Sequence, residues 1–479
     1  MQYDLIIVGT GFASSFFLRR YLDKCGPKAR ILVLERGYYH PHAERMQVDR
    51  GSGAFQQSKV EDREAIDNEN PEKPWTYDLS FGGSSNCWWA CTPRFLPADF
   101  ELHTRYGQGT DWPLSYDELE PYYCQAEEIM HVSGPDKTPF PRSRPYPLPA
   151  HTFNAADRIL HQQYGDHYIV QPAARARIAR EGVAACCNSA RCELCPVNAK
   201  FTIENSLSEI YRDSRVSCVY GAQAFALDTA ADTVRQVHYI WEGKQMRAEG
   251  EVVALGGNAI FNPHILLNSG DDNVFTGAGL CEQVSRMARI YLRDLDNTGS
   301  STVISANGYM LYDGPGRREE AACLIESINH PFAIRPERGK WLKVATFKFI
   351  FEDLLQAGNR VRVTEDPLKP QVVYQGFSEY ARRGLERLEE KLPRIFACLP
   401  VEKIEINPEV SKTESHLLGT TRMSREPDKG VIDRYLIHHR WRNLLVLGGG
   451  AFPAISPANP TLTLSALSLW AADRVMGST

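Results

Sequence analysis

Long apolar runs and blocks of like charge are both missing from this sequence. No apolar segment approaches the roughly 20 residues that a membrane-spanning helix needs, and the first expected strand begins almost at Met1, which leaves no room for a signal peptide. The net charge is −5, with both signs dispersed. These absences argue against a membrane span and against nucleic-acid binding, and they predict a cytoplasmic protein that acts on small molecules.

A dinucleotide-binding pattern occupies residues 3–37. The apolar run 5–8 leads directly into Gly9-Thr10-Gly11, and a second apolar run, 31–34, ends at Glu35. In this pattern Gly9 permits a tight turn and Gly11 lets a pyrophosphate approach a helix N-terminus, while Glu35 accepts from a ribose hydroxyl. The motif predicts a bound dinucleotide, and by itself it does not separate FAD from NAD.

Three later segments also place glycines beside apolar residues. Gly82-Gly83-Ser84 precedes Trp88 and Trp89, a combination that suits backbone packed against a flat ligand, or an ordinary turn with buried tryptophans. Residues 251–260 and 443–450 each run from an expected strand into glycines, and residues 461–475 predict a helix. Short strand-like runs between residues 302 and 374, followed by one helix over 378–396, indicate a second domain with an antiparallel sheet.

Four of the twelve cysteines crowd into ten residues. Short spacings that end in Cys-Pro are typical of iron–sulfur ligands, and the alternative is a compact loop of packed thiols. Zinc is less well matched, since no second ligand pair follows at the usual spacing. We predict no metal ion and keep an iron–sulfur cluster as the alternative, with Cys186, Cys187, Cys192 and Cys195 as its ligands.

A base and an amide flank the last glycine segment. His416 can take a proton at neutral pH, and Asn459 can donate to an oxygen on which negative charge develops. A histidine satisfied in the core and an asparagine in a turn before Pro460 are the alternatives.

Taken together, these motifs resemble the glucose–methanol–choline (GMC) oxidoreductases over nearly the whole chain. Trp88, residues 91–93 and residues 111–113 are most similar to the sugar-oxidising branch of pyranose oxidases and FAD-dependent sugar dehydrogenases. The resemblance implies an α/β fold with a Rossmann-like FAD-binding domain and an antiparallel-sheet substrate-binding domain. We expect FAD-binding segments at 1–130, 201–275 and 416–479, a connector with the cysteine loop at 131–200, and the substrate domain at 276–415.

The resemblance also implies the site residues. His416 matches the catalytic base of the family, and Asn459 matches its second catalytic position. Cys87 stands where some pyranose oxidases join a histidine to the flavin, so we expect non-covalent FAD. The implied FAD contacts are Gly9, Gly11, Phe12, Ala13, Glu35, Arg36, Gly82, Gly83, Ser84, Asn86, Val219, Ala254, Gly450, Ala451, Asn459 and Thr461.

The implied reaction is oxidation of an alcohol on a sugar, amino sugar, polyol or glycoside to a carbonyl, by hydride transfer to flavin N5 with oxygen as acceptor. Two alternatives stay open. One is an FAD and iron–sulfur dehydrogenase that passes electrons to a protein partner, because bacterial glucose dehydrogenases carry a cluster in a segment resembling residues 186–195. The other is a non-redox lyase on the same fold.

Overall fold

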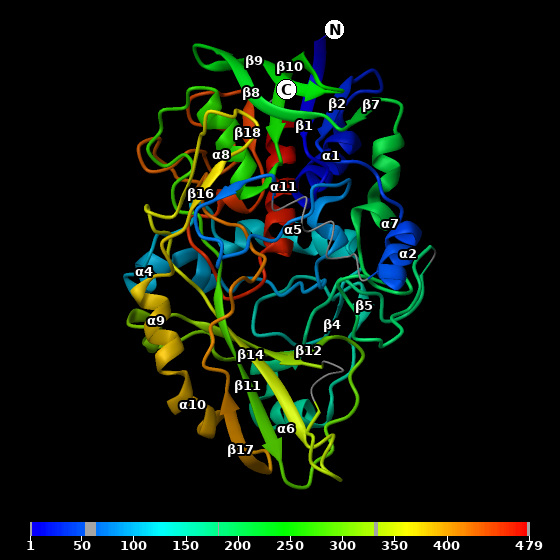
Figure 1. Ribbon diagram of the computed structural model, residues 1–479, viewed down its shortest axis with the longest axis vertical. Helices are drawn as coiled ribbons and strands as arrows, with labels where there is room; N and C mark the ends of the chain where they lie inside the picture. The colour runs from blue at the N-terminus through cyan, green and yellow to red at the C-terminus, as the bar shows by residue number, and fades with distance from the viewer. Residues whose placement is uncertain (1, 53–63, 181, 330–333, 477–479) are drawn as a thin grey trace.

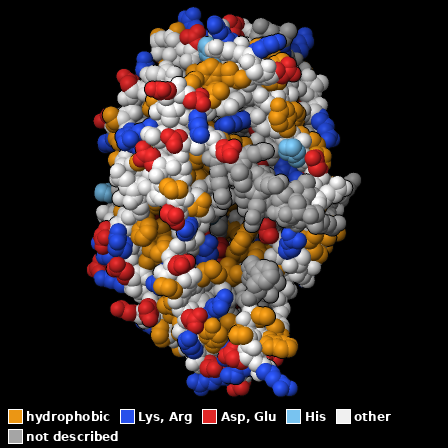
Figure 2. Space-filling view, in the orientation of Figure 1, with side chains coloured by type: hydrophobic (Ala, Val, Ile, Leu, Met, Phe, Trp, Pro, Cys, Tyr) orange, Lys and Arg blue, Asp and Glu red, His pale blue; other side chains and the backbone are white. Residues whose placement is uncertain are grey.

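The computed structural model describes residues 2–52, 64–180, 182–329 and 334–476. Two large sheets lie toward opposite ends of its long axis, with the N-terminus beside the first sheet (Figure 1). No helix within the described ranges combines the length and the apolar character needed to cross a membrane. Lys and Arg side chains alternate with Asp and Glu over the described part of the face in Figure 2.

The first sheet is built on parallel strands that are apolar on both faces. Its order is β7-β2-β1-β10-β9-β8, and β18 pairs with the C-terminal part of β10. Strands β1 and β2 carry the predicted apolar runs, and the residues 5–7 and 31–34 are buried, as strands covered on both faces require. The strands are β1 (Gln2–Val8), β2 (Ile31–Glu35), β7 (Val216–Tyr220), β8 (Gln223–Ala230), β9 (Thr233–Trp241), β10 (Lys244–Leu255) and β18 (Leu444–Val446).

Three helices from distant parts of the chain pack together on this sheet. They are α1 (Phe12–Lys24), α5 (Tyr116–Ile129) and α11 (Thr461–Met476), with α11 in contact with both others (Figure 1). The N-terminal and C-terminal segments therefore share one layer. Helix α8 (Asn258–Asn268) follows β10 directly, so its N-terminus lies at the same sheet edge as that of α1.

The second sheet is antiparallel, with the order β17-β11-β14-β13-β12-β6. Helices α6 (Ala155–Tyr164), α9 (Glu379–Glu386) and α10 (Leu388–Ile395) contribute to a hydrophobic core with it. The single helix expected over 378–396 is thus wrong: it is broken at Arg387, and Leu385 and Leu388 on either side of the break are both buried. The strands are β6 (Tyr168–Val170), β11 (Val284–Leu292), β12 (Ile304–Leu311), β13 (Cys323–Ile328), β14 (Val344–Phe351) and β17 (Val401–Ile406).

Smaller elements connect the two sheets. A three-stranded sheet has the order β15-β16-β3, and a two-stranded sheet pairs β4 with β5. These strands are β3 (Asp67–Asn68), β4 (Ser133–Gly134), β5 (Leu148–Pro149), β15 (Arg360–Arg362) and β16 (Gln371–Val373), and the remaining helices are α2 (His42–Ser52), α4 (Leu102–Tyr106) and α7 (Ile203–Leu207).

Candidate active site

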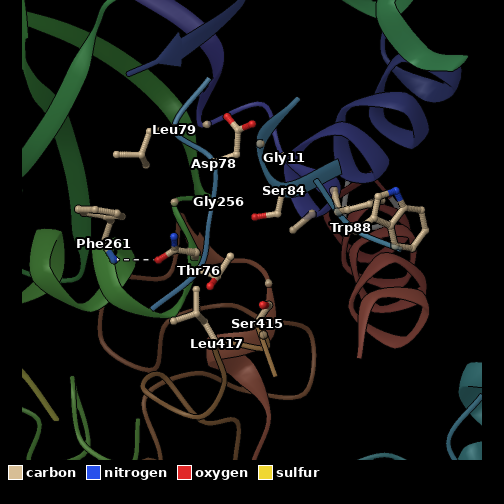
Figure 3. A pocket seen from close by; sticks show the side chains of 18 of the residues that line it. Gly11, Thr76, Asp78, Leu79, Ser84, Trp88, Gly256, Phe261, Ser415 and Leu417 are labelled. Atoms are coloured by element: carbon tan, nitrogen blue, oxygen red, sulfur yellow. Dashed lines mark hydrogen bonds between the residues drawn. The ribbon is translucent and has the colours of Figure 1, made fainter. Parts of the chain in front are cut away.

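A cavity of about 700 Å³ is lined by residues from both sheets, a size in the range typical of ligand sites. One part of its wall comes from the glycine turns that follow β1 and β10, and another comes from strands β12, β13 and β14. Figure 3 shows Gly11, Gly256 and Leu417, from segments far apart in the sequence, around one space. Parallel strands that end at one edge create such a crevice in open α/β sheets.

The first glycine turn has the geometry that the sequence predicts. Gly9 has φ +89°, and a Cβ at this position would lie 2.9 Å from the Gly256 carbonyl oxygen. Gly11 is the N-cap of α1 and has no capping side chain, so the first N–H groups of this helix lack an internal partner. A Cβ on Gly11 would meet no protein atom within 4 Å. The turn thus presents open space and free donors, as an anionic pyrophosphate requires.

A buried hydrogen-bond network joins this turn to the next glycine segment. Glu35 accepts from the Thr10 N–H at 2.9 Å, from the Thr10 hydroxyl at 2.6 Å and from the Gly37 N–H at 2.8 Å. The same Thr10 hydroxyl accepts from the Gly82 N–H at 2.9 Å. Burial raises the pKa of Glu35. Glu35 therefore organises the turn, and it still lines the cavity where a ribose hydroxyl could reach it.

Ten of the predicted FAD contacts lie on the cavity wall. They come from four separate segments, which are the glycine turn after β1, the end of β2, the Gly83 turn and the start of α11. These residues are Gly9, Gly11, Phe12, Ala13, Glu35, Arg36, Gly83, Ser84, Asn459 and Thr461.

The structure places the other six predicted contacts behind the wall. Gly82 and Asn86 stabilise the loop that carries them. The Gly82 N–H donates to the Thr10 hydroxyl, and the Asn86 amide donates to the Phe81 carbonyl at 3.0 Å. Ala254 lies inside the sheet between Ile7 and Leu445. The residues outside the wall are Gly82, Asn86, Val219, Ala254, Gly450 and Ala451.

Neighbouring residues replace these on the wall. Gly256 and Gly257 take the place of Ala254, and residues 222–225 take that of Val219, which pairs with Leu34 inside the sheet. At the triple glycine, Gly448 and Gly449 line the cavity, because the Gly450 Cα faces the Thr420 and Thr421 hydroxyls.

His416 lines the cavity at the far end of the glycine segment, and its ring is held by one side chain. The Nδ1 atom lies 2.9 Å from the Oε1 atom of Gln283. The Nε2-H₂ group of Gln283 donates to the carbonyls of Ser456 at 2.9 Å and Ala458 at 3.1 Å. Because both amide hydrogens of Gln283 are used, its Oε1 can only accept, so the proton of a neutral His416 must lie on Nδ1.

The Nε2 atom of His416 is consequently the basic nitrogen. No described residue forms a hydrogen bond with it, and His416 is on the cavity wall. Burial lowers the pKa of His416 to about 4, so the imidazole is neutral at physiological pH. Sequence reasoning missed Gln283, since it lies 133 positions away with no local pattern to mark it.

The backbone around His416 is fixed by a buried ion pair. Glu282, paired with Lys73, accepts from the N–H groups of Glu414 at 2.8 Å and His416 at 3.3 Å. Adjacent residues 282 and 283 thus hold the main chain and the imidazole of the same segment.

Asn459 lies near His416 in the cavity wall, 9% exposed. Its Oδ1 atom is buried with no hydrogen-bond partner among the described residues. Gln283 bonds the preceding carbonyl, and the Ser456 hydroxyl bonds Asp99 at 3.1 Å. The loop that carries Asn459 is therefore tied down on two sides, while the amide itself keeps capacity for a ligand.

The cysteine loop adjoins the cavity, and its four thiols have separate surroundings. Among the described residues, no three His, Cys, Asp or Glu side chains lie where they could hold a metal ion. Cys187 is exposed, whereas the other three thiols bond different partners. Cys186 donates to the Ser301 carbonyl at 3.0 Å, Cys192 accepts from Arg175 at 2.6 Å, and Cys195 accepts from the Ala199 N–H at 3.3 Å.

The residues present fit FAD. The open N-terminus of α1 suits the pyrophosphate, and Glu35 suits the ribose. Trp88 and Trp89 on the wall offer aromatic surface beside the Gly83 turn, and the orphaned Oδ1 of Asn459 marks a polar group built to meet a ligand.

This chain resembles known proteins in one family-specific segment, in its overall sequence and in its fold. Residues 359–468 match the family model described as GMC oxidoreductase. The chain is 26% identical over 445 residues to the fructose dehydrogenase large subunit of Gluconobacter japonicus, covering 82% of this chain and 80% of that protein. It is 26% identical over 518 residues to 6'''-hydroxyparomomycin C oxidase of Streptomyces lividus, covering 98% and 90%.

The fold matches as well. The crystal structure of pyridoxine 4-oxidase from Mesorbium loti superimposes with a TM-score of 0.67 at 15% identity, covering 98% of this chain and 99% of that one. The glycine turns, the His416 end of the cavity and the fold agree with the match of residues 359–468 to the GMC oxidoreductase family model, so this C-terminal part of the chain resembles that family.

Proposed function

We propose that the enzyme oxidises an alcohol group of a sugar, amino sugar or glycoside to a carbonyl, with oxygen as the final electron acceptor. The observation that carries this proposal is the His416 and Gln283 pair, which leaves one basic nitrogen in the cavity. The names of the relatives support a sugar-like substrate and include both a dehydrogenase and an oxidase.

The residues have separate tasks in the reaction. The Nε2 atom of His416 takes the hydroxyl proton of the substrate, while the Nδ1–H group of His416 keeps donating to Oε1 of Gln283 and so orients the ring. Asn459 donates an amide N–H to the substrate oxygen as negative charge develops on it. Bound FAD supplies the acceptor for the hydride that leaves the same carbon. The substrate thus loses one proton and one hydride, and the carbonyl forms.

The FAD is proposed to bind without a covalent link. Cys87 lies on the cavity wall beside Trp88, and no histidine occupies this position. Acid precipitation of the purified enzyme should release all yellow flavin into the supernatant. Flavin that stays in the protein pellet would show a covalent bond.

Anaerobic mixing of the holoenzyme with a panel of sugars, amino sugars and glycosides tests the reaction. At least one compound should bleach the flavin absorbance, and readmitted oxygen should restore it with formation of peroxide. Failure of every compound to bleach the flavin would favour a lyase. Bleaching without peroxide formation, in a protein that contains iron, would favour a dehydrogenase with a protein acceptor.

A further inference from the structure

The part of the cavity wall formed by the second sheet carries ionisable groups that the oxidation itself does not use. Glu326 on β13 and Lys348 on β14 are cross-strand partners, and both line the cavity. The amide of Asn459 is a hydrogen-bond partner of Glu326. This ionisable wall, made of Glu326, Lys348 and Glu414, therefore adjoins the residues proposed to hold the reacting oxygen.

Lys348 is already neutralised within this wall. Its ammonium pairs with Glu414, which also accepts from the Ser285 hydroxyl. Glu326 is different, because it is 3% exposed and its Oε1 atom has no hydrogen-bond partner in the described part of the chain. A buried carboxylate oxygen without a partner is costly, and such atoms mark places where a ligand supplies the missing donor.

A second carboxylate approaches from the cysteine loop. Glu193 lines the same cavity, and its carboxylate has no hydrogen bond or ion pair with the described residues. Cys192 of the cysteine loop packs with Ile304 and Ile328 of β12 and β13, so the loop and the second sheet line the same cavity. The Oε1 atom of Glu326 and the carboxylate of Glu193, from different elements, therefore lack a hydrogen-bond partner among the described residues and line one cavity.

The charge balance at this end is negative. The carboxylates on this part of the wall are Glu193, Glu326 and Glu414, and the ammonium on it is that of Lys348. The buried cations Lys200 and Arg175 lie behind the wall, where Lys200 donates to the Glu193 carbonyl and Arg175 to Cys192. On the wall itself three carboxylates therefore face one ammonium, which favours a cationic ligand. Burial raises the pKa of Glu326 to about 7 even with Lys348 beside it, so a second neighbouring cation would keep the carboxylate more fully ionised.

We propose that Glu326, assisted by Glu193, binds a protonated amine of the substrate, so that the enzyme prefers amino sugars to neutral sugars. This inference rests on the proposed function and deepens it by naming the substrate class. Lys348 then serves to hold Glu414, and it leaves Glu326 as the group that recognises the ammonium.

Binding to the oxidised holoenzyme tests the preference without turnover. The probes are glucose and three aminoglucoses with the amine at carbon 2, 3 or 6, measured by anaerobic titration calorimetry. At least one aminoglucose should bind about 10-fold or more tightly than glucose, the size expected of a hydrogen bond to a charged group. Glu326→Gln should remove this preference, so that the aminoglucose and glucose bind with similar affinities.

Two further variants make the test decisive. Glu193→Gln, in a half-buried loop position, should weaken the same aminoglucose by about 3-fold, and it serves as the test if Glu326→Gln does not fold. Glu405→Gln, on the exposed side of β17, is the matched control and should change no affinity. The proposal is overturned if no aminoglucose binds more tightly than glucose, or if the variants weaken both sugars equally.

The outcomes also separate this proposal from the proposed oxidation. An amine preference that depends on Glu326, in an enzyme whose flavin no sugar reduces, would support the amine site and reject the oxidation. Flavin reduction by sugars without any preference for an amine would support the oxidation and reject the amine site.

Discussion

Gln283 determines which nitrogen of His416 carries the proton. Both of its amide hydrogens are bonded to the backbone carbonyls of Ser456 and Ala458, so its oxygen is the only group left to face the imidazole. A neutral Gln283 also leaves the pKa of His416 low, at about 4. We therefore propose that Gln283 positions His416, the proposed base, without contacting a reacting atom.

Gln283→Glu should shift the pH dependence of flavin reduction. A carboxylate beside His416 stabilises the protonated imidazole and so raises its pKa. In the unchanged enzyme the base is neutral well above pH 4, and the rate should fall only as the pH approaches that pKa. In the variant the acidic fall should move upward by about one pH unit or more, as measured by anaerobic stopped-flow at several pH values.

The control for this experiment is Gln375→Glu, at an exposed position outside the cavity wall. It introduces the same charge and should leave the profile in place. A Gln283→Glu enzyme with an unshifted profile would mean that Gln283 does not contact the base during the reaction.

At the level of a single element, the glycine turn after β1 contains two glycines with different structural roles. Gly9 needs its positive φ and lies against the Gly256 backbone, whereas Gly11 has φ −70° and faces open space. The fold therefore requires the first glycine, and we propose that the second leaves room for the FAD pyrophosphate.

Alanine variants at the two positions should distinguish the role of Gly9 in stability from the role of Gly11 in FAD binding. Gly9→Ala should destabilise the apoprotein by about 1–2 kcal/mol or more, because an L-residue is strained at this φ. Gly11→Ala should leave apoprotein stability unchanged and weaken FAD binding by about 10-fold, since the added methyl group occupies ligand space. Urea unfolding and flavin titration measure the two effects. A Gly11→Ala protein that binds FAD normally would place the pyrophosphate elsewhere.

Local patterns predicted this turn, in which Gly9 has a positive φ. They did not predict Glu326, Lys348 or Gln283, because these residues are brought to the site by strand register and long-range packing. The exact wall residues were also hard to predict. A glycine segment shows where a turn occurs, but it does not show which of its residues face the ligand, as Gly449 and Gly450 illustrate.

At the scale of the whole molecule, the cofactor cavity joins the first sheet to the C-terminal segment and to the second sheet. The antiparallel sheet expected from the short strands between 302 and 374 is confirmed, including the strand at 344–351. Strand β12 of this sheet pairs with β6, which lies more than a hundred residues earlier in the chain, and no pattern in the sequence predicts that pairing.

FAD should therefore stabilise the entire fold. At a free concentration about 100 times its Kd, a ligand bound only by the native state adds about 2.7 kcal/mol to the free energy of unfolding. The urea midpoint of the apoprotein should rise accordingly on addition of FAD, and the shift should be smaller for Gly11→Ala at the same concentration. An unchanged midpoint would show that the folded chain does not bind the cofactor.

The rate of flavin reduction in His416→Ala tests whether His416 is the catalytic base. With FAD still bound and a saturating reducing substrate, stopped-flow absorbance should show a rate about 100-fold or more below that of the unchanged enzyme, since general-base catalysis contributes about this much. His103→Ala, an exposed histidine outside the cavity wall, should reduce its flavin at the normal rate. A normal rate in His416→Ala would contradict the account and remove His416 as the base.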